Sequence, residues 1–262
     1  MVYQSKKKQI VAALFAVASI AAAGTVGAED FSSTNIQLFA TSRAKTDVFN
    51  GTGTANENLT VFRAEHYGTW KYGDNYIALD LFNGKQVGGA TSGSFGANTN
   101  NQMFFVYQPR ISLSKAANVN LGNGFVKDVY LSYRREQASY ANFYSNNYGI
   151  SVDLAVPGTV FFEQDFLVRH TNTDSGTKWL SRTVWLAPFK VGSAGMHFDG
   201  LVLVRSTDNF GTSILAQPDL LFDVLPKGQL QVGVRLEYAR YKNPAGGTYS
   251  RTSPFLLAKL AF

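Results

Sequence analysis

Polar and apolar residues alternate along short stretches of this chain, and Gly, Asn, Asp and Pro separate the stretches. Alternation with a period of two predicts β-strands that have one polar and one apolar face. Between residues 229 and 242, for example, Val232, Val234 and Leu236 share one face, and Arg235 and Glu237 share the other. The pattern predicts an all-β chain. The twelve predicted strands lie at about 33–43, 57–72, 75–83, 102–113, 125–136, 142–155, 159–170, 178–189, 196–206, 212–225, 229–242 and 251–262.

The connections between these stretches differ in length in a regular way. Those after even-numbered stretches are mostly tight turns, such as 73–75, 156–158 and 226–228, and contain Gly-Asp-Asn or Pro-Gly. Those after odd-numbered stretches are mostly longer and polar, as at 44–56, 84–101, 171–177 and 243–250. Long extracellular loops and short periplasmic turns are typical of antiparallel outer-membrane β-barrels. One connection, 114–124, is long where this pattern predicts a short turn.

Charges of both signs occupy the polar face of several predicted strands. Arg63 lies two residues from Glu65, and Arg134 lies two residues from Glu136. Across a narrow lumen such groups can pair and hold water, whereas on an open surface they would contribute little. We therefore expect the apolar face to contact lipid and the polar face to surround an aqueous interior.

The last stretch, PFLLAKLAF at 254–262, fits the same arrangement. Leu256, Ala258, Leu260 and Phe262 are expected to face lipid, and Lys259 the lumen. Because hydrocarbon offers no partner to backbone N–H and C=O groups, this strand must pair with the first one. The terminal aromatic residue, Phe262, resembles the C-terminal signature by which outer-membrane barrels are handed to their assembly machinery.

Aromatic residues near the strand ends predict girdles at the two membrane–water boundaries. They are Trp70, Tyr72, Tyr76, Trp179, Phe189, Phe210, Tyr238 and Tyr241. Some residues depart from the pattern. The polar residues His66, Gln164 and Arg240 fall on the apolar face, and Pro109, Pro188 and Pro218 fall inside strands, where each removes a ladder hydrogen bond and predicts a bulge or a rim position.

The first residues predict a secretory signal. A basic run at 6–8 and an apolar run at 10–23 precede the small residues Val26, Gly27 and Ala28. The apolar run is short of the roughly 20 residues of a membrane-spanning helix. We expect cleavage near residue 28, export through the Sec pathway of a Gram-negative cell, and a single barrel domain at 29–262. Without this segment 21 basic residues remain against 18 acidic ones, which gives no indication of nucleic-acid binding.

Three stretches of the chain are similar to one known family. ENLTVFRAEHYGTWKYGDNYIALDLFNG at 57–84, MFFVYQPRISLSK at 103–115 and NNYGISVDLAVPGTVFFEQDFLVR at 146–169 resemble the nucleoside-specific channel-forming (Tsx-type) outer-membrane porins. The similarity lies in Glu65 ahead of Trp70, in Pro109-Arg110, and in the Asp153 strand that turns through Pro157-Gly158. Gln108 stands before Pro-Arg where the family often has an acid. The resemblance implies a twelve-stranded monomeric barrel, with a narrow pore for nucleosides and deoxynucleosides.

Such a channel would bind its solute weakly at fixed polar and aromatic groups, because conduction needs binding good enough to enter and weak enough to leave. The expected inward-facing charged residues are Arg63, Glu65, Asp80, Arg110, Asp128, Arg134, Asp153, Glu163, Arg169, Arg205, Asp219, Arg235, Glu237 and Lys259. A base could stack on Tyr67, Tyr130 or Phe161, and base–aromatic stacking contributes about 1–3 kcal/mol. The alternative role of these charges is an ion-pair network that holds the strands together.

Other functions remain open at this point. An outer-membrane barrel enzyme would need a catalytic group, and His197, two residues before Asp199, is the histidine that shares a polar face with a carboxylate. No common catalytic, phosphate-binding or calcium-binding motif occurs in the sequence. A general or structural barrel and a soluble periplasmic β-barrel binder are further alternatives. We expect no cofactor and no metal; the expected partners are membrane lipid, lipopolysaccharide, nucleosides and the assembly machinery.

Overall fold

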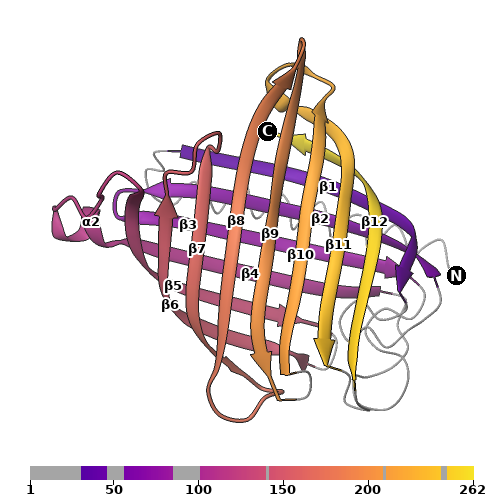
Figure 1. Ribbon diagram of the computed structural model, residues 1–262, viewed down its shortest axis with the longest axis horizontal. Coiled ribbons are helices and arrows are strands. Elements are labelled where there is room, and N and C mark those ends of the chain that lie inside the picture. The colour runs from indigo at the N-terminus through magenta and orange to yellow at the C-terminus, as the bar shows by residue number, and fades with distance from the viewer. Residues whose placement is uncertain (1–30, 46–55, 85–100, 140–141, 209–210, 243–246) are drawn as a thin grey trace, which may run out of the picture.

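In the computed structural model, residues 31–45, 56–84, 101–139, 142–208, 211–242 and 247–262 are described, and they form a closed antiparallel β-barrel (Figure 1). Each strand pairs with its neighbours in the chain, and β1 pairs with β12. The described strands are β1 (Phe31–Lys45), β2 (Asn56–Trp70), β3 (Gly73–Gly84), β4 (Asn101–Ser112), β5 (Val126–Ala138), β6 (Tyr144–Leu154), β7 (Phe161–Thr171), β8 (Lys178–Val191), β9 (Ala194–Thr207), β10 (Gly211–Asp223), β11 (Leu230–Lys242) and β12 (Thr248–Ala261). The predicted fold class and twelve strands are confirmed.

The two ends of the barrel differ as the connections predict. β2 and β3 are joined by residues 71–72, and β8 and β9 by residues 192–193. Because the sheet is antiparallel, these turns lie at one end, which we call the short-turn end, together with the start of β1 and the end of β12. The other end, the long-loop end, carries the connections that follow odd-numbered strands. The predicted signal segment lies outside the described residues.

The long connection at the short-turn end contains a helical turn. Helix α2 (Leu113–Ala117) follows β4 directly, and Ser112 caps its N-terminus by accepting a hydrogen bond from the Lys115 amide at 3.0 Å. Asn118 ends the helix in the left-handed conformation, with φ of 52°. The local sequence therefore specifies a capped turn here, which explains why 114–124 departs from the short-turn pattern.

β12 closes the barrel against β1 in a continuous register. Asn35 pairs with Ala261 and Ala40 pairs with Leu256. The amide of Phe262 donates a hydrogen bond to the Thr34 carbonyl at 2.9 Å. Leu256 is 70% exposed and Phe262 is 71% exposed, as expected for residues on the outer face.

Alternation divides the side chains into an outer and an inner set. On neighbouring strands, Leu131, Ile150 and Phe166 are exposed on the outer face, while Arg134 and Glu136 are buried on the inner face. An apolar outer surface around a polar interior is the reverse of a water-soluble domain and fits a barrel embedded in lipid. In the described ranges, no helix is long and apolar enough to cross a membrane.

Two of the unexpected polar residues on the outer face have local partners. Gln164 on β7 donates to Ser181 Oγ at 2.9 Å and accepts from Thr183 Oγ1 at 2.6 Å, both on β8. His66 Nδ1 lies 2.8 Å from Thr34 Oγ1, on the adjacent strand β1. Cross-strand hydrogen bonds therefore reduce the cost of placing these groups on an apolar face.

The expected effect of the strand prolines is partly wrong. Pro188 lies near the end of β8, which is a rim position. At Pro109 the pairing of β4 with β5 is interrupted, and at Pro218 the pairing of β10 with β11 is interrupted. In both places the pairing resumes in the same register, without a bulge, and the pairing with the other neighbouring strand is continuous. A local gap suffices because each proline lacks only one N–H donor.

Two members of the predicted aromatic girdles face inward instead. Tyr76 donates its hydroxyl to Glu65 Oε2 at 2.9 Å, and Tyr241 is buried. In the alternation along its strand, each of these tyrosines occupies an inward-facing position. Alternation therefore predicts which face a residue occupies better than its distance from the strand end does. Trp179 is 45% exposed on the outer face, as predicted, and Phe210 lies outside the described residues.

Candidate channel lumen

One wall of the lumen is lined by a network of ion pairs with Arg110 at its centre. Arg110 on β4 donates two hydrogen bonds to Asp74 on β3, at 2.7 and 2.6 Å. It also contacts Asp153 on β6 at 2.8 Å and Glu163 on β7 at 3.0 Å. Its guanidinium lies 4.2 Å from the ring centroid of Tyr130. One cation therefore joins strands from β3 to β7.

The network continues along β7 and β8. Arg182 pairs with Glu163 and, at 3.0 Å, with Asp165. Gln108 donates to Asp165 at 3.0 Å and accepts from Arg134 at 2.8 Å. We call the seven residues Asp74, Gln108, Arg110, Asp153, Glu163, Asp165 and Arg182 the ion-pair network.

Small residues beneath the network give the long side chains room. Ser112, Ser132, Ser145 and Ser151 face inward on β4, β5 and β6, and all are buried. A serine fills little volume and can hydrogen-bond a charged neighbour; Ser112, for instance, donates to Asp128 at 2.5 Å. The alternation of serine with arginine and carboxylate thus allows side chains to fold over this wall.

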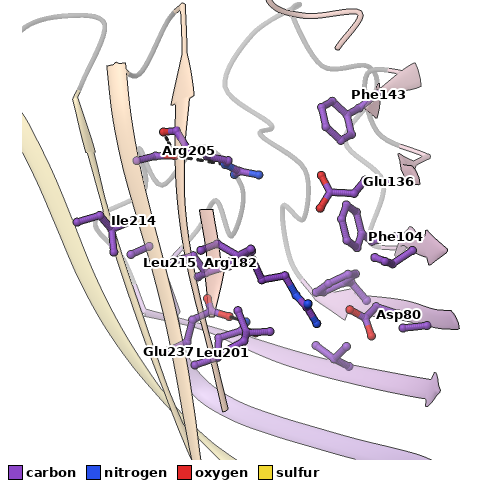
Figure 2. Close-up of a pocket in the computed structure, with 18 of the residues that line it drawn as sticks. Asp80, Phe104, Glu136, Phe143, Arg182, Leu201, Arg205, Ile214, Leu215 and Glu237 are labelled. Atoms are coloured by element: carbon purple, nitrogen blue, oxygen red, sulfur yellow. Dashed lines mark hydrogen bonds between the residues drawn. The ribbon is translucent and has the colours of Figure 1, made fainter. Parts of the chain in front are cut away.

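A cavity of about 230 Å³ lies beside the ion-pair network, towards the long-loop end. Figure 2 shows Glu136, Phe104 and Asp80 on one wall and Leu201 and Leu215 on the facing wall. Arg182 extends between them. The cavity is smaller than the roughly 300–1,000 Å³ of most ligand pockets, so it has room for one small solute or a few waters.

The cavity combines guanidinium groups with aromatic rings. Six arginines and four carboxylates line it. Arg63 binds Asp80 through two hydrogen bonds at 2.6 and 2.8 Å, and Arg235 binds Asp219 through two at 2.7 Å. The guanidinium carbons of both arginines lie over the ring of Phe39, at 5.5 and 4.2 Å from its centroid. The arrangement offers flat apolar surfaces next to fixed hydrogen-bond donors.

At the long-loop end, two connections are joined by an acidic clip. Asp174 accepts hydrogen bonds from Arg169 at 2.7 Å and from the Asp208 amide at 2.9 Å. Asp208 in turn accepts from the Lys178 ammonium group and from the Ser175 hydroxyl at 2.7 Å. The bonds from Lys178 and Ser175 lower the pKa of Asp208 to about 2. We call Asp174, Ser175, Lys178 and Asp208 the rim clip.

The structure places the predicted lumen residues in several groups. The cavity is lined by Arg63, Asp80, Arg134, Arg169, Arg205, Arg235 and Glu237. Arg110, Asp153 and Glu163 belong to the ion-pair network. Tyr67 hydrogen-bonds Asp74, and Tyr130 stacks with Arg110. Glu65 accepts hydrogen bonds from the uncharged side chains of Asn35, Gln37 and Tyr76. Asp128 bonds Ser112, Asp219 bonds Arg235, and Lys259 lies 3.9 Å from Asp199. Phe161, at the start of β7, is 39% exposed.

Sequence reasoning missed the apolar part of the lumen. Phe39, Phe82, Phe104 and Phe255 line the cavity, yet they were not among the residues predicted to face inward. Parity was the available signal: Phe39 follows Asn35 and Gln37 on the inner face of β1, and Phe255 precedes Lys259 on that of β12. Only Tyr67, Tyr130 and Phe161 were considered as inward aromatic residues, so these four were overlooked.

His197, the histidine considered for catalysis, pairs with a carboxylate on the neighbouring strand. His197 Nε2 lies 3.2 Å from Asp223 Oδ1 on β10. Its partner is therefore not Asp199, the carboxylate two residues away in the sequence. Within the described ranges, no group of three or more His, Cys, Asp or Glu side chains is placed to hold a metal ion.

A closed barrel with an apolar exterior and a charged, partly hollow interior defines an outer-membrane channel for small solutes. The model of the family "Nucleoside-specific channel-forming protein, Tsx" matches residues 37–199. The chain belongs to this family, and the resemblance seen in the sequence is confirmed. The short-turn end is therefore the periplasmic end, and the long-loop end is extracellular.

Other comparisons are more distant. No curated protein matches the chain. Among solved structures, a KdgM porin in complex with disordered oligogalacturonate is 6% identical, with a TM-score of 0.46 over 88% of this chain and 99% of that one. CdiB from Acinetobacter baumannii is 8% identical, with a TM-score of 0.37 over 88% of this chain and 60% of that one. A bacterial polysaccharide outer membrane secretin is 8% identical, with a TM-score of 0.38 over 89% of this chain and 99% of that one.

Proposed function

We propose that the barrel conducts nucleosides and deoxynucleosides by passive diffusion, without catalysis. The family match supports the solute class. The observation that carries the proposal is the composition of the cavity, in which aromatic rings adjoin arginine and carboxylate groups. A nucleoside has the same two parts, a flat base and a hydroxylated sugar.

The cavity offers each part of a nucleoside a suitable surface. Phe104 projects into the cavity opposite Leu201 and Leu215, so a base can lie between an aromatic ring and aliphatic side chains (Figure 2). Base–aromatic stacking contributes about 1–3 kcal/mol, which gives weak and rapidly reversible binding. Asp80, held by Arg63 at 2.6 Å, presents a carboxylate that can accept a hydrogen bond from a ribose hydroxyl.

The ion-pair network supplies the narrow part of the path. Gln108, Arg110 and Asp165 are almost completely buried, so side chains occupy the lumen on this wall. A neutral, hydrogen-bonding solute can exchange bonds with such groups one at a time. An apolar solute could not replace those bonds, and leaving charged groups unpaired is costly.

Proteoliposome uptake tests this proposal. The purified barrel should admit uridine and adenosine faster than a disaccharide of comparable size, because the disaccharide lacks a base to stack. Replacing the cavity aromatic, Phe104→Ala, should weaken nucleoside binding by about 1–3 kcal/mol and reduce the preference accordingly.

The matched control is Phe198→Ala, which removes a phenylalanine from the outer face, where Phe198 is exposed beside Trp185. This variant should keep the wild-type preference. Equal uptake of nucleosides and disaccharide by the wild-type barrel would instead make it a general diffusion pore.

A further inference from the structure

Acidic and basic residues are distributed differently over the two faces of the barrel. The aspartates and glutamates whose side chains are described in the strands all lie on the inner parity, whereas arginines occur on both. The outer face carries Arg135 on β5 and Arg240 on β11, each within three residues of the extracellular end of its strand. The membrane-facing surface is therefore positively charged at its extracellular edge.

Around Arg135 the outer face forms a continuous polar row. Arg135 lies between Tyr107 on β4 and Asn146 on β6, and Asn146 is paired with His170 on β7. Arg135 Nη1 donates to Asn146 Oδ1 at 2.9 Å. These four residues thus form one line of strand register across four adjacent strands.

Tyrosines fix the position of the basic groups in this row. The Arg135 guanidinium lies 4.6 Å from the ring centroid of Tyr144, and the Tyr133 hydroxyl donates to Asn146 Oδ1 at 2.7 Å. The ring of His170 is stacked on that of Tyr148, with centroids 5.5 Å apart. Arg135 and His170 are held in place by neighbours, unlike freely rotating surface side chains.

The height of the row corresponds to the lipid headgroups. Leu131 and Ile150, further along the same strands towards the periplasm, are exposed apolar residues that contact hydrocarbon. Arg135 is four residues from Leu131, which is about 13 Å along a strand. With the strands tilted by about 35–45°, Arg135 lies about 10 Å nearer the extracellular side than Leu131, at the membrane–water interface where tyrosines are enriched.

We propose that Arg135, Asn146 and His170, with Tyr133, Tyr144 and Tyr148, bind a phosphate group of an anionic glycolipid in the outer leaflet, namely the lipid A part of lipopolysaccharide. A guanidinium carries five N–H donors, and Arg135 uses one on Asn146, so others can form the paired hydrogen bonds that phosphate favours. No carboxylate of the described outer face competes for it. The exposed tyrosine rings can pack against the sugar and the upper acyl chains.

The test measures binding of lipid A to the full barrel, delipidated in detergent, with EDTA present to remove bridging divalent cations. Bisphosphorylated lipid A should bind at least about tenfold more tightly than dephosphorylated lipid A, because charge-assisted hydrogen bonds are lost with the phosphates. Arg135→Gln should abolish most of this difference. Inorganic phosphate at millimolar concentration should compete weakly, which would distinguish a lipid site from a free-phosphate site.

The control is Lys127→Gln, which removes an exposed cation from the other end of the same strand. It should bind bisphosphorylated lipid A as the wild type does. Equal binding of the two lipid A forms by the wild type would overturn the proposal, whether or not the Arg135 variant folds. Unchanged preference in a folded Arg135→Gln barrel would do the same.

This site goes beyond the proposed function and is independent of the permeant. Nucleoside uptake should be the same for Arg135→Gln and wild-type barrels in phospholipid vesicles, so failure of either proposal can be recognised separately.

Discussion

Arg110 contacts Asp74, Asp153 and Glu163, which come from three other strands. Buried charges are stable only while they remain paired, and removing one partner of a buried pair typically costs about 3–5 kcal/mol. The role of this arginine is therefore both structural and electrostatic. It neutralises carboxylates that would otherwise dominate the narrow part of the lumen.

Replacing Arg110 with alanine should widen the channel and make it more selective for cations. The three carboxylates would lose their common partner, and the volume of the guanidinium would be vacated. Planar-bilayer recordings should show a higher conductance and a reversal potential, under a KCl gradient, that moves towards the potassium equilibrium potential.

Arg235→Ala is the comparison, because Arg235 pairs with a single carboxylate, Asp219. Its effect on selectivity should be smaller. An equal shift in both variants would show that the position of the charge in the lumen, and not its number of partners, determines selectivity.

The rim clip joins two neighbouring hairpins, the one formed by β7 and β8 and the one formed by β9 and β10. Asp208 directly follows β9. Its partner Ser175 lies in the connection between β7 and β8, and its partner Lys178 is the first residue of β8. The connection between β7 and β8 is thus held against the one between β9 and β10. The connection between β7 and β8 contributes to the extracellular mouth, since Thr173 and Asp174 line the cavity.

The clip should be stable at neutral pH and open only in strong acid. The pKa of Asp208 is lowered to about 2, so the charged carboxylate is favoured in the folded protein. Its contribution is complete above the ordinary aspartate pKa of about 3.9 and is lost as the pH falls through about 2. An NMR titration of the Ser175 amide should therefore have its midpoint near 2.

At pH 7, Asp208→Asn should speed hydrogen exchange of the Ser175 amide, because the charged acceptor is lost. Asp128→Asn, at the periplasmic end, serves as the control and should leave that amide unchanged. A titration midpoint near the ordinary aspartate value would contradict the proposed role of Lys178 and Ser175.

Strands were predictable from the sequence because alternation reports directly which face a residue occupies. The polar side chains Arg63 and Lys259 were placed inward on this basis, and the structure agrees. Helix α2 was not predicted, since its capping residue Ser112 also ends a strand. Contacts such as Arg110–Glu163 could not be predicted either, because they depend on how sharply the sheet bends, which periodicity does not encode.

Closure of the whole barrel depends on the pairing of β1 with β12. The pairing extends from Ala40–Leu256 to Asn35–Ala261, and the amide of Phe262 adds a hydrogen bond to Thr34. The aromatic ring of Phe262 is exposed and packs little against the barrel itself. A role in recognition during assembly therefore remains our prediction for this ring.

Deleting Phe262 should reduce the amount of folded barrel in the outer membrane of cells, while the purified variant should still fold in detergent. Heat-modifiable migration on a gel measures both. Phe262→Tyr keeps an aromatic ring and should restore assembly in cells. Normal assembly after the deletion would show that the assembly machinery does not need this residue.

The ion-pair network also has a geometric consequence for the barrel as a whole. In a flat sheet, β4 and β7 would lie three strand spacings apart, roughly 14 Å. The side chain of Arg110 nevertheless contacts that of Glu163 at 3.0 Å. The sheet must therefore curve tightly between β4 and β7, and the Arg110 side chain bridges the two strands across the inside of the curve. The length of one side chain thus helps to set the cross-section of the pore, and a shorter residue at position 110 would let this curve relax towards a rounder outline.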